Sequence, residues 1–509
     1  MISRKNASKI GLILGPVLFV LFVIIPIGEL EQQLSFEGRI VLAATLWIGI
    51  WWITEAIPIY ITALLPLVIF PSLNIMELGQ TSTNYADRVV FLFLGGFILA
   101  KAVEKSNLHI RFALNILKVF GTDPKYIVAA FMVVTGFLSA WMSNTATTML
   151  MLPIAAAVIS IFHNKNDQHR FAVCLMLSVA YSASLGGMAT LIGTPPNAIL
   201  VSLSKSITDI DISFGQWLLV GLPISGISLG VAWLYMISFG AKITHIKSII
   251  EEKDLILKKL SSLGSINRDE KLVAAIFAAT AIAWISRGLL WKDVLPMVDD
   301  SMIVIIAAIS LFLLPSVFPN GENNYSRGIN KKESGEDSDI KGSKKNNSYN
   351  MKLLDWNTAV KIPWGVLLLI GGGLALADAF TTTGVDKWIA QQLNFLGGMH
   401  YLILILVIVS ITIFSGEIIS NTATAALMIP ISASLATTLN INPILLMVPI
   451  TLATSYGFIM PVGTPPNAIV FASGHVTVAK MARAGFPLDV IGIIIVSALS
   501  SFLVPLIWH

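Results

Sequence analysis

Two short polar motifs occur twice in this chain, and each copy lies within strongly apolar sequence. Residues 143–147 read Ser-Asn-Thr-Ala-Thr, and residues 193–199 read Gly-Thr-Pro-Pro-Asn-Ala-Ile. Both motifs return in the same order at 420–424 and 463–469. In a membrane protein, helix-breaking segments at corresponding positions of two halves indicate a solute-binding site at the repeat interface. The motifs are therefore the first candidates for function.

The side chains and backbone of these motifs could bind both a cation and an anion. Consecutive prolines at 195–196 and 465–466 prevent an uninterrupted helix and free backbone N–H and C=O groups. Freed carbonyls, with Ser, Thr and Asn oxygens, suit a hard cation such as Na⁺, and half-helix N-termini suit an anion. Within a membrane such a break is tolerated only where protein or a water-lined cavity satisfies the freed groups.

None of the four motifs contains Lys, Arg or His. An anionic solute would therefore be bound by helix dipoles, amides and hydroxyls, and bound cations would supply the missing positive charge. A simpler interpretation of one Ser/Thr/Asn cluster is hydrogen bonding between packed helices, and of one Pro-Pro pair a kink. The ordered repetition of both motifs disfavours these interpretations.

The elements that must position the motifs are membrane-spanning helices. Of the 509 residues, 55% are hydrophobic and 12% charged, and the mean hydropathy is +0.80. Soluble domains carry about 25% charged residues. We therefore predict an all-α polytopic membrane protein with about eleven transmembrane helices of ~20 residues and two re-entrant hairpins. The apolar segments are 10–29, 39–57, 59–73, 86–101, 127–162, 171–204, 213–240, 271–290, 301–316, 362–380, 401–436, 442–473 and 485–508.

Charge in the connections predicts how the chain crosses the membrane, because Lys and Arg concentrate in cytoplasmic loops. The basic start of the chain places an uncleaved first span with its N-terminus in the cytoplasm. Segments 127–162 and 401–436 have the length of helical hairpins, and 171–204 and 442–473 that of interrupted helices. An odd number of crossings separates the two sets. The repeats are therefore expected to be inverted, with the C-terminus outside.

The repeats predict four regions of the chain. Residues 1–85 form N-terminal scaffold helices, and residues 241–361 hold a cytoplasmic connection, two spans and a polar linker at 317–355. Residues 86–240 and 362–509 form the two inverted repeats. Each repeat contains an arm helix (102–121 or 378–397), a hairpin, a broken helix and a following span.

Other reactive residues carry less of the argument. Glu417 precedes the second Ser-Asn-Thr by one helical turn, where the first repeat has Ala140. This asymmetry favours a supporting hydrogen bond over direct ligation, although a role in coupling stays open. Cys174 is the only cysteine, so no disulfide forms within one chain. The histidines and this cysteine have no spacing for a nucleophile–base pair or a metal, which makes an intramembrane enzyme a remote alternative.

At both Ser-Asn-Thr tips and both Gly-Thr-Pro-Pro-Asn breaks, the chain resembles the divalent anion/sodium symporter family of di- and tricarboxylate transporters. The order of repeats, arms and linker is similar too, so the resemblance covers nearly the whole chain. It implies a homodimer in the lipid bilayer of a bacterial inner membrane, with a scaffold domain and a transport domain that moves as an elevator. It also implies import of a succinate-, malate- or fumarate-class substrate with Na⁺ as the coupling ion, no organic cofactor and no nucleic-acid partner.

The resemblance further implies site residues at the matching positions. Substrate carboxylates would contact Asn144, Thr145, Thr194, Asn421, Thr422 and Thr464. One Na⁺ would be bound by Ser139, Ser143, Asn144 and Gly193, and a second by Gly416, Ile419, Asn421 and Gly463, partly through backbone carbonyls. Gly416 stands where relatives can carry a hydroxyl residue, so the second set lacks that side-chain contribution.

Several transport functions stay open at this point, because neutral hydroxyl and amide donors serve more than one anion. The family that the chain resembles also includes Na⁺-independent dicarboxylate exchangers and symporters of sulfate or citrate. A channel is disfavoured, since broken inverted repeats are typical of alternating access.

Overall fold

The computed structural model is all-helical in the part of the chain that it describes, namely residues 4–24, 34–119, 123–160, 164–240, 243, 260–291, 294–316, 352–392, 399–461 and 463–508. Within these residues there is no β-strand, only an isolated bridge between Pro315 and Lys352. The predicted all-α fold is confirmed. Nearly all of the predicted polar linker lies outside the described residues.

The first half of the chain builds one hairpin and one broken helix between outer helices. Its helices are α1 (Arg4–Ile24), α3 (Phe36–Thr54), α4 (Ile59–Thr62), α5 (Leu65–Ser72), α6 (Leu78–Thr83), the 3-10 helix η1 (Asn84–Ala86), α7 (Arg88–Lys105), α8 (Leu108–Val119), α9 (Pro124–Ser139), α10 (Asn144–Ile159), α11 (Lys165–Gly187), α12 (Pro195–Thr208), α13 (Phe214–Tyr235), the π-helix η2 (Met236–Gly240), α15 (Arg268–Ser286), the π-helix η3 (Arg287–Trp291) and α16 (Asp300–Leu313).

The second half repeats the order of a long helix, a short arm, a hairpin and a broken helix. Its helices are α18 (Trp356–Ala359), α19 (Trp364–Thr383), α20 (Val385–Gln392), α21 (Tyr401–Gly416), α22 (Asn421–Thr438), α23 (Ile444–Ala453), α24 (Pro465–Ala472) and α25 (Val478–Ile507).

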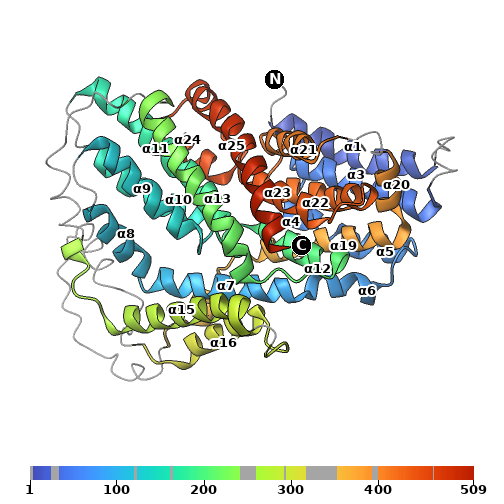
Figure 1. Ribbon diagram of the computed structural model, residues 1–509, viewed down its shortest axis with the longest axis horizontal. Coiled ribbons are helices and arrows are strands. Elements are labelled where there is room, and N and C mark those ends of the chain that lie inside the picture. Colours follow the sequence, from blue (N-terminus) through green and yellow to red (C-terminus); the bar gives the residue numbers. More distant parts are fainter. Residues whose placement is uncertain are drawn as a thin grey trace.

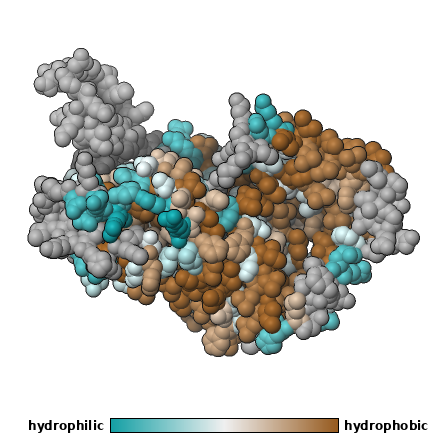
Figure 2. Space-filling view, turned by 90° about the horizontal axis from the view of Figure 1, so that it is seen from above, coloured by the Kyte–Doolittle hydropathy of each residue, from teal (hydrophilic) through white to brown (hydrophobic). Residues whose placement is uncertain are grey.

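The surface of the protein carries many apolar side chains. Six of the described helices are long and apolar enough to cross a membrane, over Asn6–Ile24, Phe36–Thr54, Asn166–Gly187, Phe214–Gly240, Trp364–Thr383 and Val478–Ile507. Figure 2 shows hydrophobic residues over a broad part of one face, with hydrophilic residues gathered toward its edges. Exposed apolar surface of this extent suits contact with lipid. The predicted count of about eleven transmembrane helices stays a prediction.

Helix α7 has ion pairs at both ends and apolar residues between them. At its start, Arg88 pairs with Asp211 at 2.6 Å and with Asp299 at 3.2 Å. At its end, Lys105 pairs with Asp355 at 2.7 Å. Residues 89–100, between these pairs, carry no charged side chain.

Three predicted boundaries differ from the structure. Segment 59–73, predicted as one span, forms the two short helices α4 and α5, and the carbonyl of Ala63 between them accepts a hydrogen bond from Tyr85 Oη. The first arm helix begins only at α8, because the chain turns at Asn107, whose φ is 60°. The second arm, α20, begins after Gly384, whose φ is 73°. Both arms therefore start after a residue in the left-handed region, which ends the preceding long helix.

The half-helices that follow the two breaks are each packed on the other repeat. Helix α12 packs against α22 and α23, and α24 packs against α10 and α11. Helices α13 and α25 also pack against each other. Figure 1 shows α7, α15 and α16 along the lower edge of the molecule, beside this interlocked group. This exchange of half-helices brings both pairs of motifs into one core.

Candidate functional site

Each Ser-Asn-Thr motif lies at the tip of a helical hairpin, α9–α10 or α21–α22. A serine caps the second helix of each hairpin. Ser143 Oγ accepts a hydrogen bond from Ala146 N at 3.3 Å, and Ser420 Oγ accepts one from Ala423 N at 3.4 Å. A serine cap stabilises a helix by about 1 kcal/mol. The caps also place the motif Asn and Thr in the first helical turn, where unpaired N–H groups and the positive end of the helix dipole lie.

Each Gly-Thr-Pro-Pro-Asn motif lies where a helix is interrupted, between α11 and α12 or between α23 and α24. The prolines occupy the first turn of the second half-helix, where a missing N–H costs nothing. The motif asparagine then fastens the unwound segment. Asn197 Nδ2 donates to the carbonyl of Thr190 at 2.7 Å, and Asn467 Nδ2 donates to that of Met460 at 3.1 Å. The two breaks thus have the same internal bond.

Oxygen atoms converge beside the first hairpin tip. Ser139 Oγ lies 2.7 Å from Asn144 Oδ1 and 2.6 Å from the carbonyl oxygen of Ala183. A hydroxyl has one hydrogen, so it donates to only one of these acceptors at a time. Added Cβ atoms at Gly187 and Gly193 would lie under 3.0 Å from Asn144 Oδ1 and Gly187 O, respectively. Close-packed oxygens that share one proton suit a hard cation such as Na⁺.

The second half-site has a glycine, Gly416, where the first has Ser139. The amide oxygen of Asn421 is buried and has no hydrogen-bond partner among the residues that the structure describes. An added Cβ at Gly463 would lie 3.2 Å from Gly416 O and 3.5 Å from Gly457 O. Backbone carbonyls therefore line the space at Gly463. A buried polar atom without a partner costs about 1–3 kcal/mol, so the Asn421 oxygen is suited to a ligand.

Glu417 supports the second break through hydrogen bonds, as its position in the sequence predicts. Its Oε1 accepts from Ile459 N at 3.0 Å, and its Oε2 accepts from Met460 N at 2.8 Å. The Oε2 atom also lies 3.5 Å from the Cβ position of Gly463. The supporting bond is thus confirmed, and the carboxylate stands at the edge of the second half-site.

Asp489 is a buried acid that the sequence analysis missed. It lies in α25 with an exposed fraction of 0%. Its Oδ1 accepts hydrogen bonds from Gly457 N and Phe458 N, both at 3.3 Å. The signal that could have found it is an ionisable residue inside an apolar membrane segment, where such residues commonly serve function.

The remaining predicted residues lie at the starts of half-helices. Thr145 and Thr422 are half-buried in the first turns of α10 and α22. Thr194 and Thr464 are the buried N-cap residues of α12 and α24. Ile419 precedes the capping serine of α22, so only its backbone could reach a cation. The structure therefore gathers the predicted residues at two hairpin tips and two breaks.

Contacts between the two broken helices join the half-sites. Tyr181 Oη in α11 donates to the carbonyl of Phe458 at 3.2 Å, and the two rings lie 4.5 Å apart between centroids. Ser228 Oγ in α13 and Tyr456 Oη are 2.6 Å apart. These bonds link the first repeat to the unwound segment of the second. The two repeats are therefore in direct contact at the second break.

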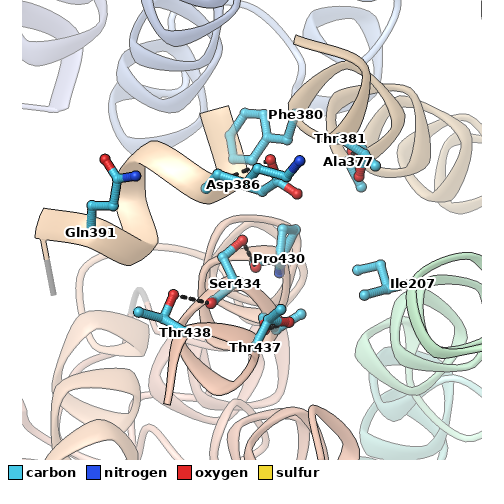
Figure 3. A pocket seen from close by; sticks show the side chains of 12 residues that line it. Ile207, Ala377, Phe380, Thr381, Asp386, Gln391, Pro430, Ser434, Thr437 and Thr438 are labelled. Carbon is cyan, nitrogen blue, oxygen red and sulfur yellow. Dashed lines mark hydrogen bonds between the residues drawn. The ribbon is translucent and has the colours of Figure 1, made fainter. Parts of the chain in front are cut away.

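A separate cavity of about 310 Å³ opens between α12, α19, α20 and α22. Figure 3 shows the side chains that line it, with α20 on one side and α22 on the other. Hydroxyls on α22 are bound to their own helix, since Ser434 Oγ donates to Pro430 O at 3.1 Å and Thr438 Oγ1 to Ser434 O at 3.0 Å. None of the predicted site residues lines this cavity. The motifs, and not this cavity, therefore define the candidate site.

The four motifs of the candidate site contain no Lys, Arg or His. Four basic side chains elsewhere, Arg88, Lys105, Arg111 and Arg287, each pair with an acid outside the motifs. The site therefore offers oxygen ligands and helix N-termini. Such a site suits an anion only when cations balance the charge.

Comparison with known proteins agrees with this chemistry. A family model described as the sodium:sulfate symporter transmembrane region matches residues 7–509. The sodium-dependent dicarboxylate transporter SdcS of Staphylococcus saprophyticus is 40% identical over 512 residues, which cover 99% of this chain and 92% of the relative. The protein of the same name from Staphylococcus aureus strain bovine RF122 is 39% identical over 507 residues, covering 98% and 91%.

Two solved structures share the fold at low sequence identity. The YdaH transporter of Alcanivorax borkumensis matches with a TM-score of 0.53 and 12% identity, covering 84% of this chain and 87% of that one. MtrF of Neisseria gonorrhoeae matches with a TM-score of 0.52 and 14% identity, covering 83% of each chain. These two show a similar fold alone. The family match spans nearly the whole sequence, so the chain belongs to the sodium:sulfate symporter family, the divalent anion/sodium symporters, and is an integral membrane transporter and not an enzyme.

Proposed function

We propose that the protein imports small dicarboxylates of the succinate, malate and fumarate class together with Na⁺. The observation that carries this proposal is the pair of uncharged, oxygen-rich half-sites. Ser139 Oγ and Asn144 Oδ1 lie 2.7 Å apart at one, and the Asn421 oxygen lacks a partner among the described residues at the other. Sodium ions at these oxygens would supply the positive charge that a dicarboxylate needs. The sodium-dependent dicarboxylate transporters at 40% and 39% identity support this substrate class.

The proposed ligands follow from the positions of the motifs. The first Na⁺ is assigned to Ser139, Ser143, Asn144 and Gly193, and the second to Gly416, Ile419, Asn421 and Gly463. The substrate carboxylates are assigned to Asn144, Thr145, Thr194, Asn421, Thr422 and Thr464. Their place in the first turns and caps of α10, α12, α22 and α24 supports this assignment, because the first N–H groups of a helix have no acceptor within the helix.

We infer an elevator mechanism in which the hairpins and broken helices move against a scaffold of the other helices. The packing of α12 on the second repeat, and of α24 on the first, supports a transport domain that moves as one body. The proposal keeps the predicted four regions, the inverted repeats and a homodimer. It also keeps a bacterial plasma membrane, with the N-terminus in the cytoplasm and the C-terminus outside.

The function is tested with purified protein in proteoliposomes. An inward Na⁺ gradient should drive accumulation of labelled succinate, and an equal choline gradient should not. Uptake that depends only on dicarboxylate inside the vesicles, with no response to Na⁺, would replace symport by exchange. Competition by malate, fumarate, citrate and sulfate, each with and without Na⁺, identifies the substrate. Sulfate that competes better than succinate would contradict the dicarboxylate assignment.

The inverted topology has its own test. Cysteines introduced singly as Lys105→Cys and Lys387→Cys should react with a membrane-impermeant maleimide from opposite sides of the membrane. Cys174, the natural cysteine, is buried and serves as the unlabelled background. Labelling of both positions from one side would refute the inverted repeats.

A further inference from the structure

Different groups bind the unwound segments of the two breaks. In the second break, Asp489 of α25 and Glu417 of α21–α22 together bind four consecutive backbone N–H groups, those of residues 457–460, at distances of 2.8–3.3 Å. The two bonds to Glu417, at 3.0 and 2.8 Å, are shorter than those to Asp489. The second break is thus clamped by the carboxyl groups of two acidic side chains.

The first break has neutral residues at both corresponding positions. Gly221-Leu-Pro-Ile-Ser at 221–225 in α13 matches Gly485-Phe-Pro-Leu-Asp at 485–489 in α25. Both glycines pack closely against a break, since an added Cβ at Gly221 or Gly485 would lie under 3.0 Å from a carbonyl oxygen of the unwound segment. Ser225 therefore corresponds to Asp489, and its Oγ donates to Leu185 O at 2.7 Å. Ala140 corresponds to Glu417, so the clamp belongs to the second repeat alone.

The hydrogen bonds to Asp489 and Glu417 determine the direction of the carbonyl groups in the second break. In a trans peptide the N–H and C=O groups lie on opposite sides. Because Asp489 binds the N–H groups of Gly457 and Phe458, the carbonyls of Tyr456 and Gly457 point away from Asp489.

These two carbonyls face the second half-site. Tyr456 O lies 3.6 Å from the Cβ position of Gly416, and Gly457 O lies 3.5 Å from that of Gly463. Gly457 O also accepts from Asn467 Nδ2 at 2.8 Å, which leaves its second lone pair for a cation. Gly457 has φ 135°, a conformation that side-chain-bearing residues rarely adopt. A glycine at 457 therefore allows the backbone conformation that gives the carbonyl this direction.

We propose that Asp489, braced by Glu417, is a positioning residue that aims the carbonyl oxygens of Tyr456 and Gly457 at the second cation. This inference rests on the proposed Na⁺-coupled function and deepens it. Residues that orient metal ligands from behind typically change metal affinity by 10- to 100-fold when replaced. Asp489 thus sets the affinity for Na⁺ without touching the substrate.

The test separates cation affinity from stability and from the maximal rate. In Asp489→Asn, which keeps the shape but replaces one acceptor oxygen by an NH₂ donor, half-maximal succinate uptake should need about tenfold more Na⁺, the lower end of that range. The maximal rate at saturating Na⁺ should stay near that of the wild type. The Na⁺-induced rise in melting temperature of the purified protein should shrink in the same proportion. Asp489→Glu should recover part of the affinity.

A matched control exists in the first repeat. Ser225→Ala removes a buried hydrogen bond at the corresponding position and should leave the Na⁺ dependence of uptake unchanged. Glu417→Gln, a second variant in case Asp489→Asn does not fold, should raise the half-saturating Na⁺ by a smaller factor.

Wild-type Na⁺ dependence in both Asp489→Asn and Glu417→Gln would overturn the inference. So would a loss of stability in choline with an unchanged Na⁺-induced shift, because that is the result of a purely structural role. A wild-type protein that shows no response to Na⁺ would instead refute the proposed function itself.

Discussion

The two half-sites share their motifs but differ in the groups that hold them. The first gathers side-chain and backbone oxygens, because Ser139 Oγ lies 2.7 Å from Asn144 Oδ1 and 2.6 Å from the carbonyl oxygen of Ala183. The second has Gly416 in place of that serine and carbonyls aimed from behind by carboxylates. The comparison teaches that one oxygen-rich site can be built from hydroxyls or from clamped backbone. The two repeats share the hairpin tip and the broken helix, whereas the groups that supply the oxygen atoms differ.

This difference has an electrostatic consequence. Near the first break the corresponding positions, Ala140 and Ser225, are neutral, whereas Glu417 and Asp489 place a pair of acidic side chains near the second. Negative charge favours cations and disfavours a dicarboxylate. We therefore expect the second half-site to contribute more to Na⁺ binding and the first to be more tolerant of the substrate's charge.

The largest expected effect is the loss of either motif asparagine. Asn144→Ala and Asn421→Ala should each reduce succinate uptake to background, because each removes an amide placed at a half-helix N-terminus in both proposed ligand sets. Uptake in proteoliposomes measures the effect, with size-exclusion elution as the check of folding. Asn115→Ala, on the arm α8 where Nδ2 bonds Arg111 O at 2.8 Å, is the control. Wild-type uptake in either site variant would refute the site.

A smaller and unequal effect is expected from the two motif glycines. An added Cβ at Gly193 would lie under 3.0 Å from Gly187 O, whereas one at Gly463 would lie 3.2 Å from Gly416 O. Overpacking costs about 1–3 kcal/mol, so Gly193→Ala should lower both the melting temperature and uptake strongly. Gly463→Ala should keep folding and raise the half-saturating Na⁺ severalfold. Equal losses of melting temperature and uptake in the two variants would show that both half-sites are equally closely packed.

The smallest effect is expected from exchanging the residue that distinguishes the half-sites. Ser139→Ala removes a hydrogen bond of about 1 kcal/mol, which corresponds to about fivefold in Na⁺ affinity. Gly416→Ser adds a hydroxyl beside Asn421, and its Cβ would meet Tyr456 O at an ordinary 3.6 Å. That variant should transport with Na⁺ affinity equal to or better than the wild type. The Na⁺ concentration for half-maximal uptake, measured for each variant, tests both expectations. An inactive Gly416→Ser together with a Ser139→Ala of wild-type Na⁺ affinity would contradict them.

Much of the fold and of the site follows from local sequence chemistry. Ser143 and Ser420 end the unwound tips because serine is a strong N-cap, and the paired prolines start α12 and α24 because proline suits the first helical turn. These rules act within a few residues, so the hairpins and breaks could be predicted from the chain alone.

What the sequence did not predict depends on contacts between distant segments. The division of segment 59–73 into two helices depends on Tyr85, whose hydroxyl donates a hydrogen bond to the carbonyl of Ala63. The role of Asp489 depends on Gly485, which lets α25 approach the carbonyl of Phe458 closely enough for the acid to reach the break. Neither contact has a local pattern, because each is made only when the helices pack.

The central claim is that Na⁺ supplies the positive charge that the candidate site lacks. Succinate binding to the purified protein, measured calorimetrically in NaCl and in choline chloride at equal ionic strength, tests this claim most directly. The account predicts binding in NaCl and none in choline chloride, with affinity rising as Na⁺ is added. Equal affinity in the two salts would contradict it.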